Sequence, residues 1–160
     1  MDASIVRLKE ELAARLQNIP RDSIVFVGVG NRLRGDDATG PEVIDLIKDR
    51  VAHAVDADSA PENVTGAIKR LKPAAIVFVD ALDFGGRPGG VRLIEAREIQ
   101  EYGASTHNLS LDVAMEYLAG ETGADVFLVG VQPERIAEGE EISPSLVEPL
   151  SYLADILSQC

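Results

Sequence analysis

The 160-residue sequence predicts an α/β fold in three αβα layers, with a mostly parallel sheet of about five strands and helices on both faces. Continuous apolar runs at residues 24–27, 75–79 and 126–129 indicate buried strands, because a parallel strand covered on both sides needs no polar face. Segments with apolar residues at three- and four-residue spacing alternate with these runs, which is typical of strand–helix–strand units. At this length we expect one domain over residues 1–160. The strand order stays open.

The first half of the chain predicts helices around two strands. An amphipathic helix over residues 1–19 ends before Pro20 and is expected to cover one face of the sheet. After the strand at 24–27 and a glycine loop, a helix begins at about Ala38, and a short strand at 54–57 follows it. Ser59 to Glu62 have the form of a capping box that opens a further helix.

The second half continues the same alternation. The run at 75–79 ends in Asp80, and a loop rich in glycine precedes residues 91–94, whose weaker alternation predicts an edge strand. A helix is expected to start next to His107. The strand at 126–131 is followed by a polar loop over 132–141, the expected place for partner contact, and by a closing helix that begins at Ser143 and Pro144.

Composition restricts the class of protein. The net charge of −12 argues against nucleic acid and anionic membranes as partners. No apolar run approaches the roughly 20 residues of a membrane span, and the N-terminus lacks the pattern of a signal peptide, so we expect a cytoplasmic protein without membrane insertion. Cys160 is the single cysteine, which leaves no disulfide framework or thiolate metal cluster, and we expect it to be a bystander.

Acidic residues and a histidine stand where an α/β sheet collects its ligands. Asp36 and Asp37 follow the first strand, Asp80 ends the run at 75–79, and His107 comes directly before a helix. Asp37, Asp80 and His107 together offer mixed oxygen and nitrogen ligands, which suit a borderline divalent cation such as nickel or zinc.

Structural explanations for the same residues stay open. Asp36 and Asp37 have the position and type of helix caps, Asp80 is equally suited to hold loop N–H groups, and His107 is suited to a cap or a buried position. A dinucleotide site is disfavoured, since the glycine fingerprint requires a third glycine where this chain has Leu33.

Several motifs, in this order, resemble those of the hydrogenase maturation endopeptidases. They are GVGNRLRGDDATGP at 28–41, SAPEN at 59–63, VDALD at 79–83, THNL at 106–109 and VGVQP at 129–133. The resemblance covers residues 24 to about 157 and is closest to the hydrogenase 3, or formate hydrogenlyase, type, because of residues 59–63 and Gln132-Pro133. The helix over residues 1–19 lies outside it. Ala57 and Asp58 depart from the family pattern, which has two glycines there, and this leaves the shape of that loop open.

The resemblance implies an endopeptidase that removes the C-terminal extension of a [NiFe]-hydrogenase large-subunit precursor after nickel insertion. It implies that Asp37, Asp80 and His107 contact the metal. The nickel is expected to be supplied by the precursor, which makes the metal part of substrate recognition. The candidates for catalysis are Asp37, Asp80 and Asp36.

Two mechanisms stay open for such an enzyme. Substrate-borne nickel could polarise the scissile carbonyl or lower the pKa of a bound water. A carboxylate, Asp37 or Asp36, could instead act as general base, as in an aspartic-type peptidase. Two rival classes also stay open: a peptidase that holds its own nickel or zinc, and a non-catalytic metal-binding or chaperone module on the same fold.

Overall fold

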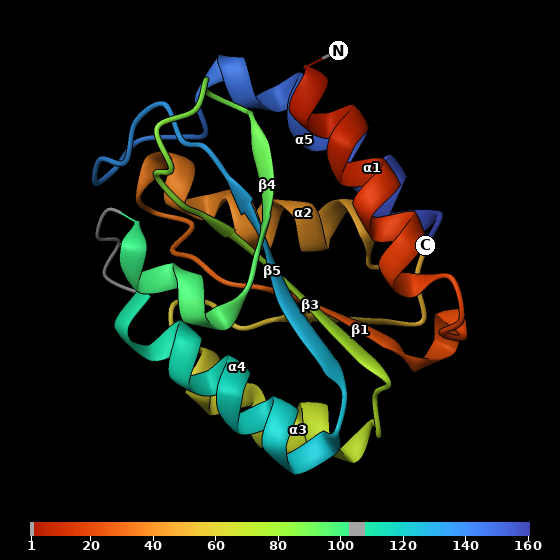
Figure 1. Ribbon diagram of the computed structural model, residues 1–160. Helices are drawn as coiled ribbons and strands as arrows, with labels where there is room; N and C mark the ends of the chain where they lie inside the picture. The colour runs from red at the N-terminus through yellow and green to blue at the C-terminus, as the bar shows by residue number, and fades with distance from the viewer. Residues whose placement is uncertain (1, 103–107) are drawn as a thin grey trace.

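A central sheet organises the chain (Figure 1). The structure is a computed structural model, and it describes residues 2–102 and 108–160. Within these residues the sheet has five strands in the order β2-β1-β3-β5-β4. The strands are β1 (Ile24–Gly28), β2 (His53–Asp56), β3 (Ala75–Ala81), β4 (Val91–Ile94) and β5 (Asp125–Val131). All neighbours are parallel except β4, which pairs antiparallel with β5 at one edge. The predicted mostly parallel sheet and the predicted edge strand are both confirmed.

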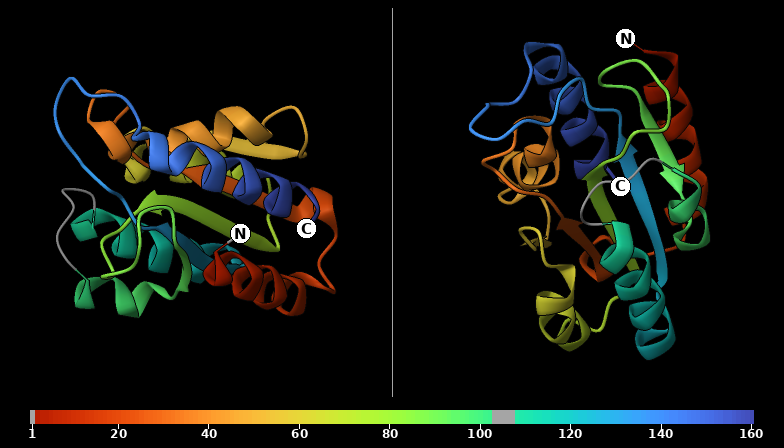
Figure 2. Two further views of the ribbon diagram at one scale, coloured as in Figure 1. Left: turned by 90° about the horizontal axis from the view of Figure 1, so that it is seen from above. Right: turned by 90° about the vertical axis from the view of Figure 1, so that its left-hand side faces the viewer.

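Helices cover both faces of the sheet. They are α1 (Ala3–Leu16), α2 (Thr39–Ile47), α3 (Thr65–Arg70), α4 (Asn108–Thr122) and α5 (Pro144–Ser158), with the 3₁₀ helices η1 (Arg21–Ser23), η2 (Gly35–Ala38), η3 (Pro61–Val64) and η4 (Ala96–Glu101). Alternate residues of each strand point to opposite faces of the sheet, so the apolar core consists of two clusters. Val77 and Val129 pack with α1, α2 and α5, whereas Ile76 and Leu128 pack with α3, α4 and η4. Figure 2 shows α2 and α5 on one side of the sheet and α4 on the other. In the described part of the chain, every helix is too short or too polar to cross a bilayer.

The N-terminal helix α1 is part of the core. It starts at a capped end, where the Asp2 carboxylate accepts a hydrogen bond of 2.7 Å from the Ser4 N–H. Its apolar stripe packs in the same cluster as β4 and β5, which confirms that this helix covers one face of the sheet. The helix ends at Leu16, three residues before the predicted end at residue 19.

An ion-pair cluster fixes α1 to the sheet from outside the core. The Arg15 guanidinium donates to both carboxylate oxygens of Asp125 and to both of Glu95, with distances of 2.7 Å to Asp125 Oδ1 and 3.0 Å to Glu95 Oε1. It also lies 4.3 Å from the centroid of the Phe127 ring. The hydrogen bonds from Asp125 and Glu95 raise the pKa of Arg15 above its ordinary value.

Shortening a side chain of the α1 stripe should therefore destabilise the whole fold. Leu12 is 1% exposed, and Leu12→Ala is expected to lower the free energy of unfolding by about 2–5 kcal/mol, because it removes buried methyl groups and leaves a cavity. Urea unfolding measures the change. Lys9→Ala is the matched control, because Lys9 is exposed on the same helix. Equal stability of the two variants would mean that α1 is an appendage.

One helix start was predicted wrongly. Ser59 and Glu62 do not form a capping box: a 3₁₀ turn from Pro61 comes first, and Ala60 stands at its N-cap without a side-chain hydrogen bond. A reciprocal capping box opens η4 instead, between Glu95 and Glu98. Glutamate is an unusual first member of that motif, so the sequence pattern does not reveal it.

Candidate active site

Close glycine packing brings Asp37 and Asp80 to the same edge of the sheet. A Cβ on Gly40 would lie 2.6 Å from the Val79 carbonyl oxygen, and a Cβ on Gly30 would lie 1.9 Å from the Asp37 carbonyl oxygen. Gly30 also has φ +152°. Because Val79 directly precedes Asp80, this approach of α2 to β3 places both acids at the carboxyl ends of the central strands, where α/β folds bind ligands.

The two carboxylates are withdrawn from solvent. Asp37 and Asp80 are each 1% exposed. The Asp37 Oδ2 atom accepts a hydrogen bond of 3.1 Å from the Asn31 N–H, which ties the acid to the glycine loop. Asp80 is the penultimate residue of β3, in register with Gly130 of β5. Two buried acids at one strand edge supply oxygen ligands of the kind that divalent cations take.

The predicted third member of the set, His107, lies outside the described residues. Among residues 2–102 and 108–160, no three histidine, cysteine, aspartate or glutamate side chains group into a metal site. The structure therefore brings Asp37 and Asp80 to one edge. The part predicted for His107 stays a prediction.

Asp36 has a different environment from its neighbour. It is 0% exposed, and its carboxylate accepts hydrogen bonds from the following donors among the described residues: the Glu134 N–H (2.8 Å), the Arg135 N–H (2.8 Å), the Ser143 hydroxyl (2.8 Å) and the Ser143 N–H (2.7 Å). Such donors compensate the buried negative charge. All of these donors belong to the segment between β5 and α5. Asp36 therefore holds this segment at the carboxyl ends of the central strands.

The expectation that the two acids cap the following helix is not met in the described structure. Both lie in η2, and the N-cap of α2 is Ala38, without a side-chain cap. Main-chain hydrogen bonds from Asp36 N–H to the Arg135 oxygen and from Gly35 N–H to the Glu140 oxygen, each 3.0 Å, hold the same segment. The predicted N-cap residue of α5, Ser143, turns its hydroxyl to Asp36 instead of to its own helix.

The loop after β2 keeps a glycine-like shape without glycine. Asp58 has φ +48°, a backbone conformation that L residues adopt at a cost. Its carbonyl accepts a hydrogen bond of 2.7 Å from the Gly30 N–H, and its own N–H donates to Asp56 Oδ1 at 2.9 Å. The loop that carries Ala57 and Asp58 thus contacts the glycine loop of the candidate site.

Asp58→Gly is expected to raise the free energy of unfolding by up to about 1 kcal/mol, because glycine adopts the positive φ without steric strain. Asp49→Gly removes the same charge from an exposed residue whose φ is negative, and it should lower stability. Thermal unfolding of both variants measures the difference. A loss of stability in Asp58→Gly would mean that its backbone is unstrained.

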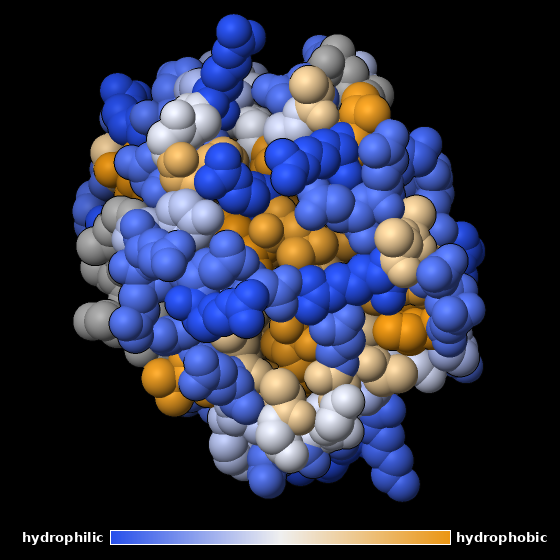
Figure 3. All heavy atoms as spheres, in the orientation of Figure 1, coloured by the Kyte–Doolittle hydropathy of each residue, from blue (hydrophilic) through white to orange (hydrophobic). Residues whose placement is uncertain are grey.

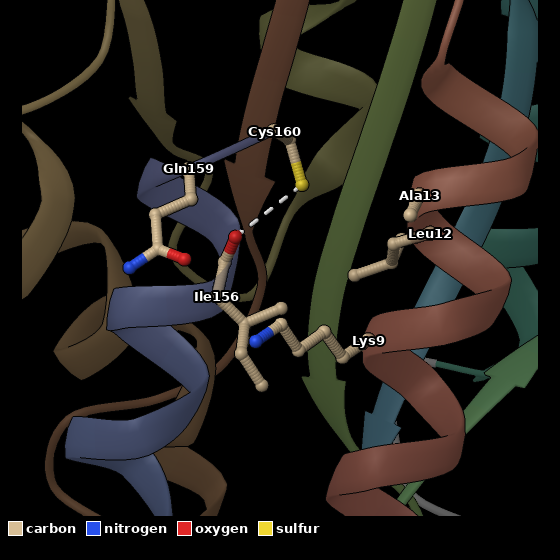
Figure 4. Close-up of a pocket in the computed structure, with 6 residues that line it drawn as sticks. All are labelled: Lys9, Leu12, Ala13, Ile156, Gln159 and Cys160. Atoms are coloured by element: carbon tan, nitrogen blue, oxygen red, sulfur yellow. Dashed lines mark hydrogen bonds between the residues drawn. The ribbon is translucent and has the colours of Figure 1, made fainter.

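Cys160 lies apart from the strand edge. It lines a cavity of about 130 Å³ between α1 and α5 (Figure 4), together with Lys9, Leu12, Ala13, Ile156 and Gln159. Its thiol donates a hydrogen bond of 3.4 Å to the Ile156 carbonyl. Burial raises the pKa of the Cys160 thiol, which disfavours the reactive thiolate. These features fit the expectation that the cysteine is a bystander.

Comparison with known proteins identifies the family. The sequence model of the hydrogenase maturation protease family matches residues 37–158. The chain belongs to this family. Among solved structures, it resembles the [NiFe] hydrogenase maturation protease HycI of Thermococcus kodakarensis KOD1, with a TM-score of 0.80 and 31% identity over 96% of this chain and 97% of that one.

Relatives from Escherichia coli agree with this assignment. The hydrogenase 3 maturation protease of strain K12 is 37% identical over 118 residues, which cover 69% of this chain and 72% of the relative. The solution structure of the E. coli endopeptidase HycI has a TM-score of 0.78 at 29% identity, over 86% of this chain and 90% of that one. The family resemblance drawn from the motifs is thus confirmed, including its hydrogenase 3 type. The protein is a hydrogenase maturation endopeptidase, a hydrolase.

Proposed function

We propose that this maturation protease removes the C-terminal extension of a [NiFe]-hydrogenase large-subunit precursor after nickel has been inserted. The observation that carries the proposal is the pair of buried acids, Asp37 and Asp80, at the carboxyl ends of two adjacent strands in a chain of this family. The description of the Thermococcus relative as a [NiFe] hydrogenase maturation protease supports the class of substrate.

We further propose that the nickel arrives with the precursor and is contacted by Asp37, Asp80 and His107. Three protein ligands would leave positions open on a divalent ion, and groups of the precursor can fill them. Carboxylate oxygens and an imidazole nitrogen suit nickel among the first-row ions. The metal is thus part of the substrate, and the protease tests for its presence before it cuts.

The proposed chemistry is hydrolysis of a peptide bond next to that ion. Nickel held by the substrate supplies polarisation of the scissile carbonyl or of a bound water. We exclude Asp36 as the general base. A carboxylate has about four acceptor positions, and hydrogen bonds from Glu134, Arg135 and Ser143 occupy those of Asp36. Asp36 is therefore left with the task of holding the neighbouring segment.

A genetic experiment tests this function. In cells that lack the gene, the cognate large subunit should remain at precursor length, as measured by intact mass. The wild-type gene should restore the mature length, and a gene carrying Asp37→Asn should not. Mature large subunit in the deletion strain would contradict the proposal. Restoration by Asp37→Asn would show that a negative charge at this residue is not essential for cleavage.

A further inference from the structure

A groove of about 930 Å³ runs along the outer edge of β4. Val91, Arg92 and Leu93 of β4 line it, together with residues from the first turns of α1. Phe84 and Tyr102 also line it. The face drawn in Figure 3 shows an apolar area near its centre, surrounded by hydrophilic side chains. Such an edge is open to an additional strand.

The main-chain groups of β4 alternate between the sheet and the groove. Gln132 N–H donates to the Gly90 oxygen, and Arg92 is in register with Gly130, so these residues of β4 bond β5. Val91 and Leu93 therefore direct their N–H and C=O groups outward. The Val91 N–H confirms this direction, since it donates to Ser4 Oγ at 3.0 Å. The outward groups of Leu93 have the geometry to pair with an extended peptide.

The groove starts close to the candidate active site. Asp80 and Arg92 are both in register with Gly130, so the three residues form one row across the sheet. Because neighbouring strands lie about 4.8 Å apart, the backbone of Arg92 is roughly 10 Å from that of Asp80. The loop that leads from β3 to the groove is fastened at the same edge, since Gln132 Oε1 accepts hydrogen bonds from the Phe84 N–H (2.9 Å) and the Gly86 N–H (3.0 Å).

Arg92 gives the groove a binding group for acids. Its guanidinium lies 4.7 Å from the ring centroid of Phe84 and 6.0 Å from that of Tyr102, and the side chain is exposed. Rings that hold the planar guanidinium prepare it for two-point contact with a carboxylate.

The acidic side chains of the groove are engaged locally. Asp2 accepts from the Ser4 N–H at 2.7 Å, and Glu98 accepts from the Glu95 N–H at 2.9 Å. Glu11 pairs with Arg7 on the same helix at 3.3 Å. In a chain with a net charge of −12, Arg92 is thus placed to complement an acidic occupant rather than to serve these neighbours.

We propose that the groove binds the C-terminal extension of the precursor as an added strand along β4, with a carboxylate of the extension on Arg92. This inference rests on the proposed function and names the surface that holds the segment to be removed. Strand addition uses main-chain hydrogen bonds for affinity and side-chain contacts for specificity. Because the Val91 N–H already donates to Ser4 Oγ, the added segment pairs with the outward N–H and C=O groups of Leu93.

A binding experiment without cleavage tests the groove. The probe is a fluorescent synthetic peptide with the sequence of the C-terminal extension from the same genome. Arg92→Glu is expected to weaken its binding about tenfold or more, because it places like charges together. Arg50→Glu makes the same charge change at an exposed residue whose guanidinium pairs with Asp155 instead. It should leave the dissociation constant within about twofold.

Main-chain pairing has its own test. An edge strand forms hydrogen bonds with every second residue of an added peptide. A peptide N-methylated at those residues should lose affinity, and a peptide N-methylated at the residues between them should keep it. Equal affinity for Arg92→Glu and Arg50→Glu, or indifference to both methylation patterns, would overturn the inference.

Cleavage assays separate this inference from the proposed function. If the wild-type protein shortens the precursor and Arg92→Glu does so with an unchanged KM, the groove assignment fails and the proposed function stands. If the peptide binds as described and the precursor stays intact, the groove assignment stands and the proposed function fails.

Discussion

Asp36→Ala is expected to lower the free energy of unfolding by about 3–5 kcal/mol, because it removes the acceptor for several buried donors at once. The Glu134, Arg135 and Ser143 main-chain N–H groups and the Ser143 hydroxyl would lose their shared partner. The segment between β5 and α5 would then detach from the strand edge. Cleavage should fall together with this loss of order.

Urea unfolding and amide hydrogen exchange measure the two effects. Ser143→Ala is the graded control, because it removes one hydrogen bond and keeps the acceptor, so it should cost about 1 kcal/mol. Exchange should accelerate at residues 134, 135 and 143 in Asp36→Ala. Unchanged exchange combined with loss of cleavage would contradict the fastening role and would return Asp36 to the position of general base.

Asp37→Asn and Asp80→Asn are each expected to lower kcat/KM by about 10²-fold or more with the fold retained, because each removes a negative charge at the reacting centre. The amide of Asp37→Asn keeps an oxygen that can accept the Asn31 N–H, so the glycine loop should stay in place. If the two acids act on one ion, the double variant should lose less than the product of the single losses.

Initial rates of precursor cleavage, followed by intact mass, measure these losses. Cys160→Ser is the control, since the thiol lies in the cavity between α1 and α5 and should not affect the rate. Normal rates for Asp37→Asn would show that a charge at this residue is not essential. Normal cleavage rates for both single variants would show that catalysis does not take place at the acids Asp37 and Asp80.

Most helices and strands could be predicted from the sequence, because apolar residues are continuous in buried parallel strands and recur every three or four residues in amphipathic helices. The run at 24–27 could only be a covered strand or a piece of helix, and the glycines after it decided for a strand. The strand order had no such local signal. It depends on how helices such as α2 and α4 pack over the sheet, and no residue spacing reports that packing.

The acids of the candidate site could be predicted from the sequence because they follow strands. The different roles of Asp36 and Asp37 could not be predicted. The donors to Asp36 lie 98 to 107 residues away in the sequence, so no local pattern connects them. The same reason hides the ion pairs of Arg15 with Glu95 and Asp125, which are 80 and 110 residues away. Positive φ at Asp58 was also hidden, because aspartate gives no signal that its backbone takes a glycine conformation.

The decisive measurement is the intact mass of a purified large-subunit precursor incubated with this protein, once loaded with nickel and once nickel-free. The proposal predicts that a C-terminal peptide is lost from the nickel-loaded precursor and that the nickel-free precursor keeps its full mass. Cleavage of both at the same rate would contradict recognition through substrate-borne nickel. An intact cognate precursor in both samples, with nickel loading verified, would contradict the proposed cleavage itself.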